Sequence, residues 1–170
     1  MIRLVGAALL VVGCGGLGLS AVNRLDSRVQ DLRELSAGLE ILQRELGWRL
    51  SPLPKALEAA AGATHERAAR FFVFCAQGSK QLAGVPFRTL WNKGLEQCPL
   101  RLSREDRALL EQLGSILGRY DGDSQRQAVE NVLAGLSRQQ AQAEDDRRRL
   151  GRVYGVLGLT AGLFLTLVLI

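Results

Sequence analysis

Hydrophobic residues follow two different patterns along the chain. Residues 4–22 and 153–170 are apolar runs without a single charged side chain. Between these runs, apolar residues recur every three or four positions, which is the spacing of an amphipathic helix. They nowhere alternate with polar residues over the length of a strand. We therefore expect an all-α chain with an apolar helix at each end and a helical domain at residues 23–152.

The longest amphipathic pattern begins directly after the first apolar run. Its apolar positions are Leu25, Val29, Leu32, Leu35, Leu39, Leu42 and Leu46. No proline separates this pattern from residues 4–22, so it predicts a helix that continues out of the apolar run to about Leu50. Pro52 and Pro54 then end it, because each proline disfavours helical geometry in the residue before it.

Turn and capping residues divide the next part of the domain into shorter helices. One helix is expected from Pro54 until Gly62 ends it, and Thr64 is expected to cap the next. The inner face of that next helix is predicted to carry Ala68, Phe71, Phe72, Cys75 and Ala76. A further short helix surrounds Trp91.

Two more helices complete the domain. Ser103, with Asp106 three residues later, resembles a capping box at a helix start. A last helix starts near Gln125 and continues into residues 153–170. The pattern thus predicts a bundle of about five to six helices.

Both apolar runs have the length of a membrane span. A helix needs about 20 apolar residues to cross the hydrocarbon of a bilayer, and the two runs supply 19 and 18. On the far side of the first run from the domain, the only basic side chain is Arg3. The arginines that flank the two runs on the side of the domain are Arg24, Arg28, Arg33, Arg147, Arg148, Arg149 and Arg152. The positive-inside rule therefore places residues 23–152 in the cytoplasm.

The first apolar run allows two other interpretations. Val11-Val12-Gly13-Cys14 resembles a lipobox, in which Cys14 would be lipidated after cleavage, and the domain would be an extracytoplasmic lipoprotein adaptor. Cleavage as an ordinary signal peptide is the other. A retained span is favoured because the apolar run continues past Cys14 and no polar region precedes a cleavage site.

Composition narrows the class of partner. The chain has 22 basic and 17 acidic side chains, a net charge of +5, and few aromatic residues. A nucleic-acid binder would more often cluster its positive charge and intersperse aromatic residues, so we expect no nucleic acid. Contact with anionic lipid headgroups or with an acidic protein surface suits this balance better, and self-association is left open.

Chemistry-bearing residues are sparse. The three cysteines have no metal-ligand spacing and no disulfide pattern, which favours a reducing compartment. His65 stands alone beside Glu66, and we expect it to face solvent. Residues 13–20 superficially resemble a phosphate-binding loop, but they lack its lysine. We therefore expect no catalytic residues, no metal and no cofactor.

An ordered set of residues carries a family resemblance. Residues 113–121 read LGSILGRYD, residues 52–57 read PLPKAL, and a predicted span lies at each end. The set comprises Pro52, Pro54, Trp91, Gly114, Gly118, Asp121 and Gln125. With it, the chain resembles the stage III sporulation protein AB family over essentially its full length.

The resemblance implies a fold, a location and partners. The cytoplasmic part would be a helical bundle similar to the type II secretion F platform domain. The protein would be a non-enzymatic platform subunit of the channel complex between mother cell and forespore, in the mother-cell membrane around the forespore. Its partners would be the cytoplasmic ATPase stage III sporulation protein AA and other membrane subunits.

The residues of the motif also have a physical interpretation. Gly114 and Gly118, four apart, would leave a smooth strip where another helix can approach closely. Asp121 can cap the turn before the last helix or bond to Gln125. All of these residues can serve folding alone. The candidates for a partner-binding face are the basic residues expected on outward helix faces: Arg67, Arg70, Arg101, Arg104 and Arg119.

Overall fold

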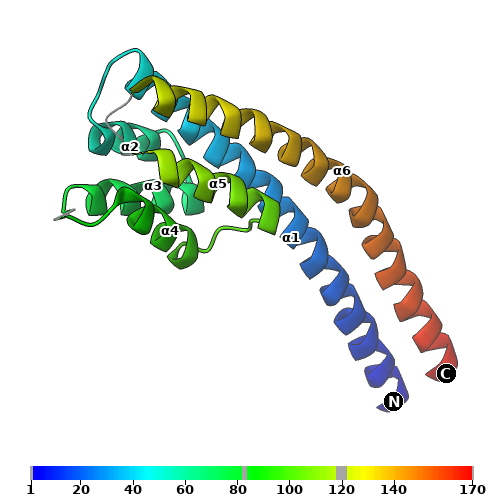
Figure 1. Ribbon diagram of the computed structural model, residues 1–170. Helices are drawn as coiled ribbons and strands as arrows, with labels where there is room; N and C mark the ends of the chain where they lie inside the picture. Colours follow the sequence, from blue (N-terminus) through cyan, green and yellow to red (C-terminus); the bar gives the residue numbers. More distant parts are fainter. Residues whose placement is uncertain (1, 82–83, 118–121, 170) are drawn as a thin grey trace. The chain divides into compact units, whose positions relative to one another are not determined.

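The computed structural model describes residues 2–81, 84–117 and 122–169, and within them it contains helices and no strand. The helices are α1 (Ile2–Gly47), α2 (Leu53–Gly62), α3 (Glu66–Ser79), α4 (Phe87–Gln97), α5 (Arg104–Ile116) and α6 (Gly122–Leu169) (Figure 1). The predicted all-α bundle is confirmed. The chain forms two compact units, which we call the bundle unit (residues 30–141) and the two-helix unit (residues 1–29 and 142–170).

The core of the bundle unit follows the predicted helix faces. The central row on α1, Leu32, Leu35, Leu39 and Leu42, is fully buried. All five positions predicted for the inner face of α3 are buried as well. Phe71 on α3 meets Trp91 on α4 edge to face, with ring centroids 4.7 Å apart. Aromatic pairs favour this geometry because the positive edge of one ring faces the negative face of the other.

The short helices pack in chain order: α2 on α3, α3 on α4, and α4 on α5 (Figure 1). Glycine permits one of the closest approaches between α1 and α3. A Cβ atom at Gly38 would lie 2.2 Å from Cε2 of Phe72, closer than carbon atoms pack. The lack of a side chain at Gly38 therefore lets the Phe72 ring of α3 approach α1 closely at this position.

One predicted helix start is confirmed and another is wrong. Ser103 and Asp106 form the capping box: the Ser103 hydroxyl accepts from the Asp106 N–H (3.1 Å), and the Asp106 carboxylate accepts from the Ser103 N–H (2.8 Å). Thr64 does not cap α3, whose N-cap residue is His65. The Thr64 hydroxyl instead donates to the carbonyl of Ala60 (3.0 Å), because a threonine can bond backward to the preceding turn as well as forward.

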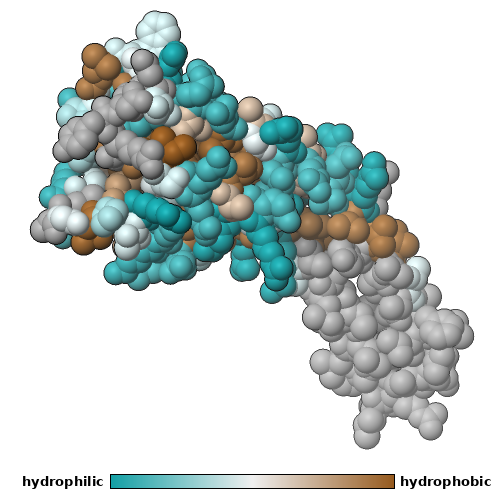
Figure 2. All heavy atoms as spheres, in the orientation of Figure 1, coloured by the Kyte–Doolittle hydropathy of each residue, from teal (hydrophilic) through white to brown (hydrophobic). Residues whose placement is uncertain are grey.

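The two-helix unit contains the first part of α1 and the last part of α6. Ion pairs join these parts: Arg147 with Asp26, and Arg28 with Asp146 at 4.0 Å. Within the part of the chain that the structure describes, no helix meets the length and apolarity of a membrane span. Most side chains of residues 4–22 and 153–170 lie outside that part, so the two predicted spans stay predictions. On the visible face of the molecule, hydrophilic side chains predominate among the described residues (Figure 2).

Candidate functional site

Two of the predicted partner-binding arginines meet at one buried carboxylate. Arg67 on α3 donates from Nε to both oxygens of Asp31 on α1, at 2.8 and 3.1 Å. Asp31 is 3% exposed. The backbone N–H of Arg101 donates to the same carboxylate at 2.7 Å. Asp31 thus holds together α1, α3 and the segment that leads into α5.

This arrangement engages the guanidinium of Arg67 in an internal ion pair. Removing a buried carboxylate from such a pair leaves its partner charge without compensation, which is costly. Arg101 contributes its backbone to the same carboxylate, while the residue itself is exposed. The cluster therefore stabilises the bundle, and of these two arginines the side chain of Arg101 is the one presented to solvent.

The remaining predicted arginines are Arg70, Arg104 and Arg119. Arg70 and Arg104 are exposed, and Arg119 lies outside the described residues. Burial raises the pKa of the Cys98 thiol, and the guanidinium of Arg70 opposes part of that rise. Burial likewise raises the pKa of Cys75, with the neighbouring Cys98 adding to it. Both thiols are therefore poor nucleophiles near neutral pH, because the thiolate is the reactive form.

Trp91 and Gly114, which belong to the sequence motif, pack against each other. Trp91 is fully buried, and its Nε1 donates to the carbonyl of Leu110 at 2.8 Å. A Cβ atom at Gly114 would lie 2.3 Å from Cδ1 of Trp91. The close approach expected at Gly114 is thus made by the indole ring of α4. Gly118 and Asp121 lie outside the described residues, and Gln125 is buried near the start of α6.

The prolines of the motif mark the start of α2. Pro52 occupies the N-cap position and Pro54 lies in the first turn, where the missing N–H removes no helical hydrogen bond. The preceding helix is shorter than predicted, since α1 ends at Gly47 and not near Leu50. The turn that follows leaves Trp48 87% and Leu50 81% exposed. The apolar periodicity missed this feature, although Trp48 does fall outside the buried row of α1.

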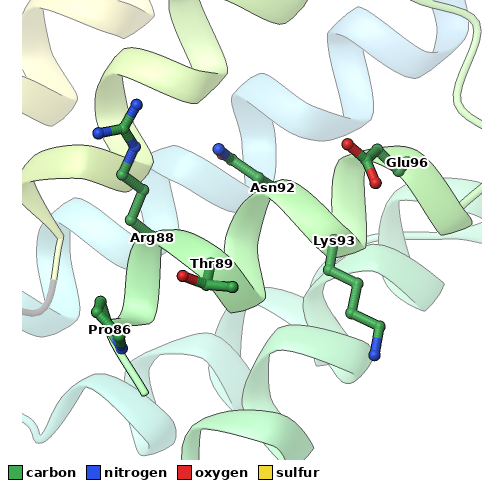
Figure 3. A pocket seen from close by; sticks show the side chains of 6 residues that line it. All are labelled: Pro86, Arg88, Thr89, Asn92, Lys93 and Glu96. Atoms are coloured by element: carbon green, nitrogen blue, oxygen red, sulfur yellow. The ribbon is translucent and has the colours of Figure 1, made fainter. Parts of the chain in front are cut away.

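A shallow hollow lies on the outward face of α4 (Figure 3). Its lining residues are Pro86, Arg88, Thr89, Asn92, Lys93 and Glu96. This lining mixes cations with one carboxylate, which suits neither a metal ion nor acid–base pairing. Among all described residues, no group of three or more histidine, cysteine or acidic side chains could hold a metal. His65 is exposed, as predicted, and its Nδ1 lies 3.3 Å from Oε2 of Glu34.

The fold and these contacts define an all-helical bundle protein, in which the ion pair at Asp31 and the Trp91–Gly114 contact hold helices together. The family model for stage III sporulation protein AB matches residues 3–170, so the chain belongs to the stage III sporulation protein AB family. The resemblance carried by the ordered motif is therefore confirmed, and family membership implies a role in sporulation.

A relative and a solved structure agree with this membership. The chain is 28% identical over 172 residues to stage III sporulation protein AB of Bacillus subtilis (strain 168), and the match covers 99% of each protein. A solved structure of a stage III sporulation protein AB is similar with a TM-score of 0.66 and 24% identity. That match covers 72% of this chain and 98% of the solved chain, and it supports the helical-bundle fold.

Proposed function

We propose that this protein is a non-enzymatic platform subunit of the channel complex between mother cell and forespore. Residues 4–22 and 153–170 cross the mother-cell membrane around the forespore. The helical domain between them lies in the cytoplasm and docks an ATPase of the stage III sporulation protein AA type. Other membrane subunits of the complex contact the spans.

The observation that carries the proposal is the composition of α1 and α6. Each helix includes one charge-free run and also supplies core residues of the bundle unit, such as Leu39 on α1 and Leu136 on α6. A domain whose first and last helices also include the apolar runs suits a role at a bilayer. Membership of a sporulation family supports the particular complex.

The proposed orientation rests on arginine position. Arg28 and Arg147 pair with Asp146 and Asp26, but such pairing does not weaken the argument. The positive-inside rule counts lysine and arginine near the ends of a span, and acidic residues contribute little to it. The arginines next to both apolar runs therefore favour the cytoplasmic side for the domain.

The assignment of ATP hydrolysis to a partner follows from the chemistry of the bundle. The buried carboxylates of Asp31, Glu45 and Asp106 each accept hydrogen bonds from within the bundle unit. The two cysteines of the bundle unit have raised pKa values. The proposed role of the bundle is therefore to bind and position the ATPase.

Co-purification tests this proposal. The full chain, with an affinity tag and solubilised from membranes of sporulating cells, is expected to retain the ATPase. An equally tagged variant with Gly38→Trp, whose new side chain would collide with Phe72 and disrupt the bundle, is the control that should not retain it. Recovery of the ATPase only in the unbound fraction, with the unaltered chain well folded, would contradict the docking function.

A further inference from the structure

The end of α1 exposes two large apolar side chains next to each other in the sequence. Trp48 and Leu50 are 87% and 81% exposed, whereas Val85 and Val73, the next most exposed in the described part of the bundle unit, are 51% and 40% exposed. A tryptophan side chain is buried for the most part in ordinary globular proteins. The exposure of Trp48 therefore needs an explanation.

Hydrogen bonds hold the turn that presents these side chains. Glu45, itself only 9% exposed, accepts from Nη1 of Arg49 (3.0 Å) and from the hydroxyl of Ser51 (2.8 Å). The N–H of Ser51 also donates to the carbonyl of Glu45 at 2.9 Å. The exposed apolar residues consequently belong to a turn with a fixed shape.

The backbone at Leu50 is strained. Its φ of 49° lies in the left-handed region, which a leucine rarely adopts because its Cβ approaches the carbonyl oxygen. Strain of this kind persists where surrounding bonds enforce it, and it is concentrated at functional sites. Here the bonds to Glu45 enforce it, and the result is an outward-facing Leu50.

Three exposed arginines lie close to this turn, two of them in sequence and one through its contact with Gly47. Arg44 lies in the last turn of α1, and its carbonyl accepts a hydrogen bond from the N–H of Trp48 at 3.0 Å. Arg49 lies between Trp48 and Leu50. Arg126 comes from α6, and its Cδ lies 3.2 Å from the place that a Cβ of Gly47 would take. Figure 1 shows the end of α1 beside the first turns of α6.

We propose that these five residues, the α1-end patch, dock a protein partner whose surface has an apolar pocket ringed by carboxylates. The inference rests on the proposed docking function and assigns it to one face of the bundle. Tryptophan and arginine are the residue types that dominate binding energy at protein interfaces. An apolar centre with a charged rim is the usual anatomy of such an interface.

The charges favour a heterologous partner over the alternatives. A second copy of this chain, related by two-fold symmetry, would bring the arginines of both copies together, which is repulsive. A lipid surface would attract the arginines as well. However, a tryptophan binds at a membrane interface wherever it lies at the level of the headgroups, and this requires no particular backbone conformation. A turn held in a strained conformation is better explained by a protein pocket of matching shape.

Binding of a purified ATPase of the stage III sporulation protein AA type tests the patch. The probe is titrated against the full chain in detergent micelles, and the dissociation constant is measured by interferometry. Trp48→Ala is expected to raise the Kd by about 10-fold or more, the effect of losing a central anchor. Arg44→Gln with Arg126→Gln is expected to weaken binding and to reduce its dependence on salt.

Matched controls separate a surface effect from a folding effect. Val85→Ala removes a different exposed apolar side chain, and Arg88→Gln with Lys93→Gln removes two charges from the outward face of α4. These controls are expected to leave the Kd unchanged. All the altered side chains are exposed, so circular dichroism and thermal unfolding should match those of the unaltered chain.

Each further outcome is decisive. An unchanged Kd for Trp48→Ala would overturn the patch while leaving the docking function in place. Absence of ATPase binding by the unaltered chain would overturn both the patch and the docking function. Trp48-dependent quenching by brominated phosphatidylglycerol would assign the patch to lipid, and a Trp48-dependent dimer in sedimentation would assign it to a second copy. Either result would overturn the inference.

Discussion

Asp31 and Trp91 show, at the scale of single residues, how polar atoms are used inside the bundle. Asp31 accepts hydrogen bonds from a side chain on α3 and from the backbone before α5. Trp91 donates to the carbonyl of Leu110 while its ring fills the space beside Gly114. Each residue thus joins different elements of the bundle. Substitutions at these contacts should therefore change the stability of the bundle.

Removing the carboxylate of Asp31 should destabilise the bundle severely. Asp31→Ala leaves the Arg67 guanidinium and the Arg101 N–H without their acceptor, and we expect a loss of about 3–5 kcal/mol in the free energy of unfolding. Urea unfolding, followed by helical circular dichroism, measures it. The double variant Asp31→Leu with Arg67→Met removes both charges and should lose much less. Equal losses in the two variants would argue against a buried ion pair.

Adding one methyl group at Gly114 should also destabilise the protein. Gly114→Ala places a Cβ 2.3 Å from Cδ1 of Trp91, and the ring cannot withdraw because Phe71 and the carbonyl of Leu110 hold it. Overpacking of this kind costs about 1–3 kcal/mol. Thermal unfolding provides the measurement.

Gly62→Ala is the matched control for Gly114→Ala. No atom lies within 4 Å of a Cβ built on Gly62, so the added methyl meets open space. Alanine favours the helix by up to about 1 kcal/mol over glycine, and the variant should be neutral or slightly more stable. Equal destabilisation of both variants would mean that the contact with Trp91 is not the cause.

At the scale of elements, side-chain hydrogen bonds define two helix boundaries, the start of α5 and the end of α1. The capping box of Ser103 and Asp106 begins α5, and Asp106 is fully buried. The bonds to Glu45 close the end of α1. These local bonds define where α5 begins and where α1 ends, and the turn after α1 leaves Trp48 and Leu50 exposed.

Loss of the capping hydroxyl should weaken α5 in particular. Ser103→Ala leaves the N–H of Asp106 without its acceptor, and we expect a cost of about 1 kcal/mol. Hydrogen exchange of the first turn of α5 should become faster, together with a lower unfolding midpoint. The control is Ser115→Ala, whose hydroxyl donates to the carbonyl of Gln112 within the helix. If Ser103→Ala behaved like this control, the cap would not be stabilising.

The sequence predicted the elements well where burial follows a helical period. Spacing alone predicts burial of the central leucines of α1 and of the five inner residues of α3, because one face of each helix packs into the core. The capping box was identified because it is a local pattern of residue types. The family motif also selected Trp91 and Gly114, which are in contact.

Other features depended on contacts that no local pattern reveals. The pair of Asp31 and Arg67 joins residues 36 positions apart, so spacing gave no sign that Arg67 would be engaged internally. Thr64 has two ways to bond the backbone, and only the packing of α2 and α3 selects one. The left-handed turn at Leu50 requires the bonds to Glu45, and the exposure of Trp48 follows from that turn.

At the scale of the whole molecule, the chain combines a packed bundle unit with a unit made from parts of its first and last helices. Membership of the stage III sporulation protein AB family connects it to sporulation. The proposed platform role requires the bundle to face the cytoplasm, since a cytoplasmic ATPase can reach it only there. The platform role therefore depends on the proposed orientation of the chain in a membrane.

Cysteine accessibility can report this orientation, provided the reporter is placed on the surface. Cys75 is unsuitable, because it is fully buried and its pKa is raised, so it would resist labelling on either side of a membrane. Gln77 on α3 is exposed. We would introduce Gln77→Cys after replacing Cys98 with serine and Cys75 with alanine, and we would keep Cys14, because the alternative lipid anchor requires it.

The most direct measurement is labelling of this Gln77→Cys chain with a membrane-impermeant maleimide in intact vegetative cells, whose plasma membrane faces the medium. The proposed cytoplasmic position of the bundle predicts no labelling until the cells are permeabilised. Ile2→Cys in the same background is the matched control and should react in intact cells, because the proposed orientation places it outside. Efficient labelling of Gln77→Cys in intact cells would contradict the platform role and would favour an extracytoplasmic adaptor anchored at Cys14.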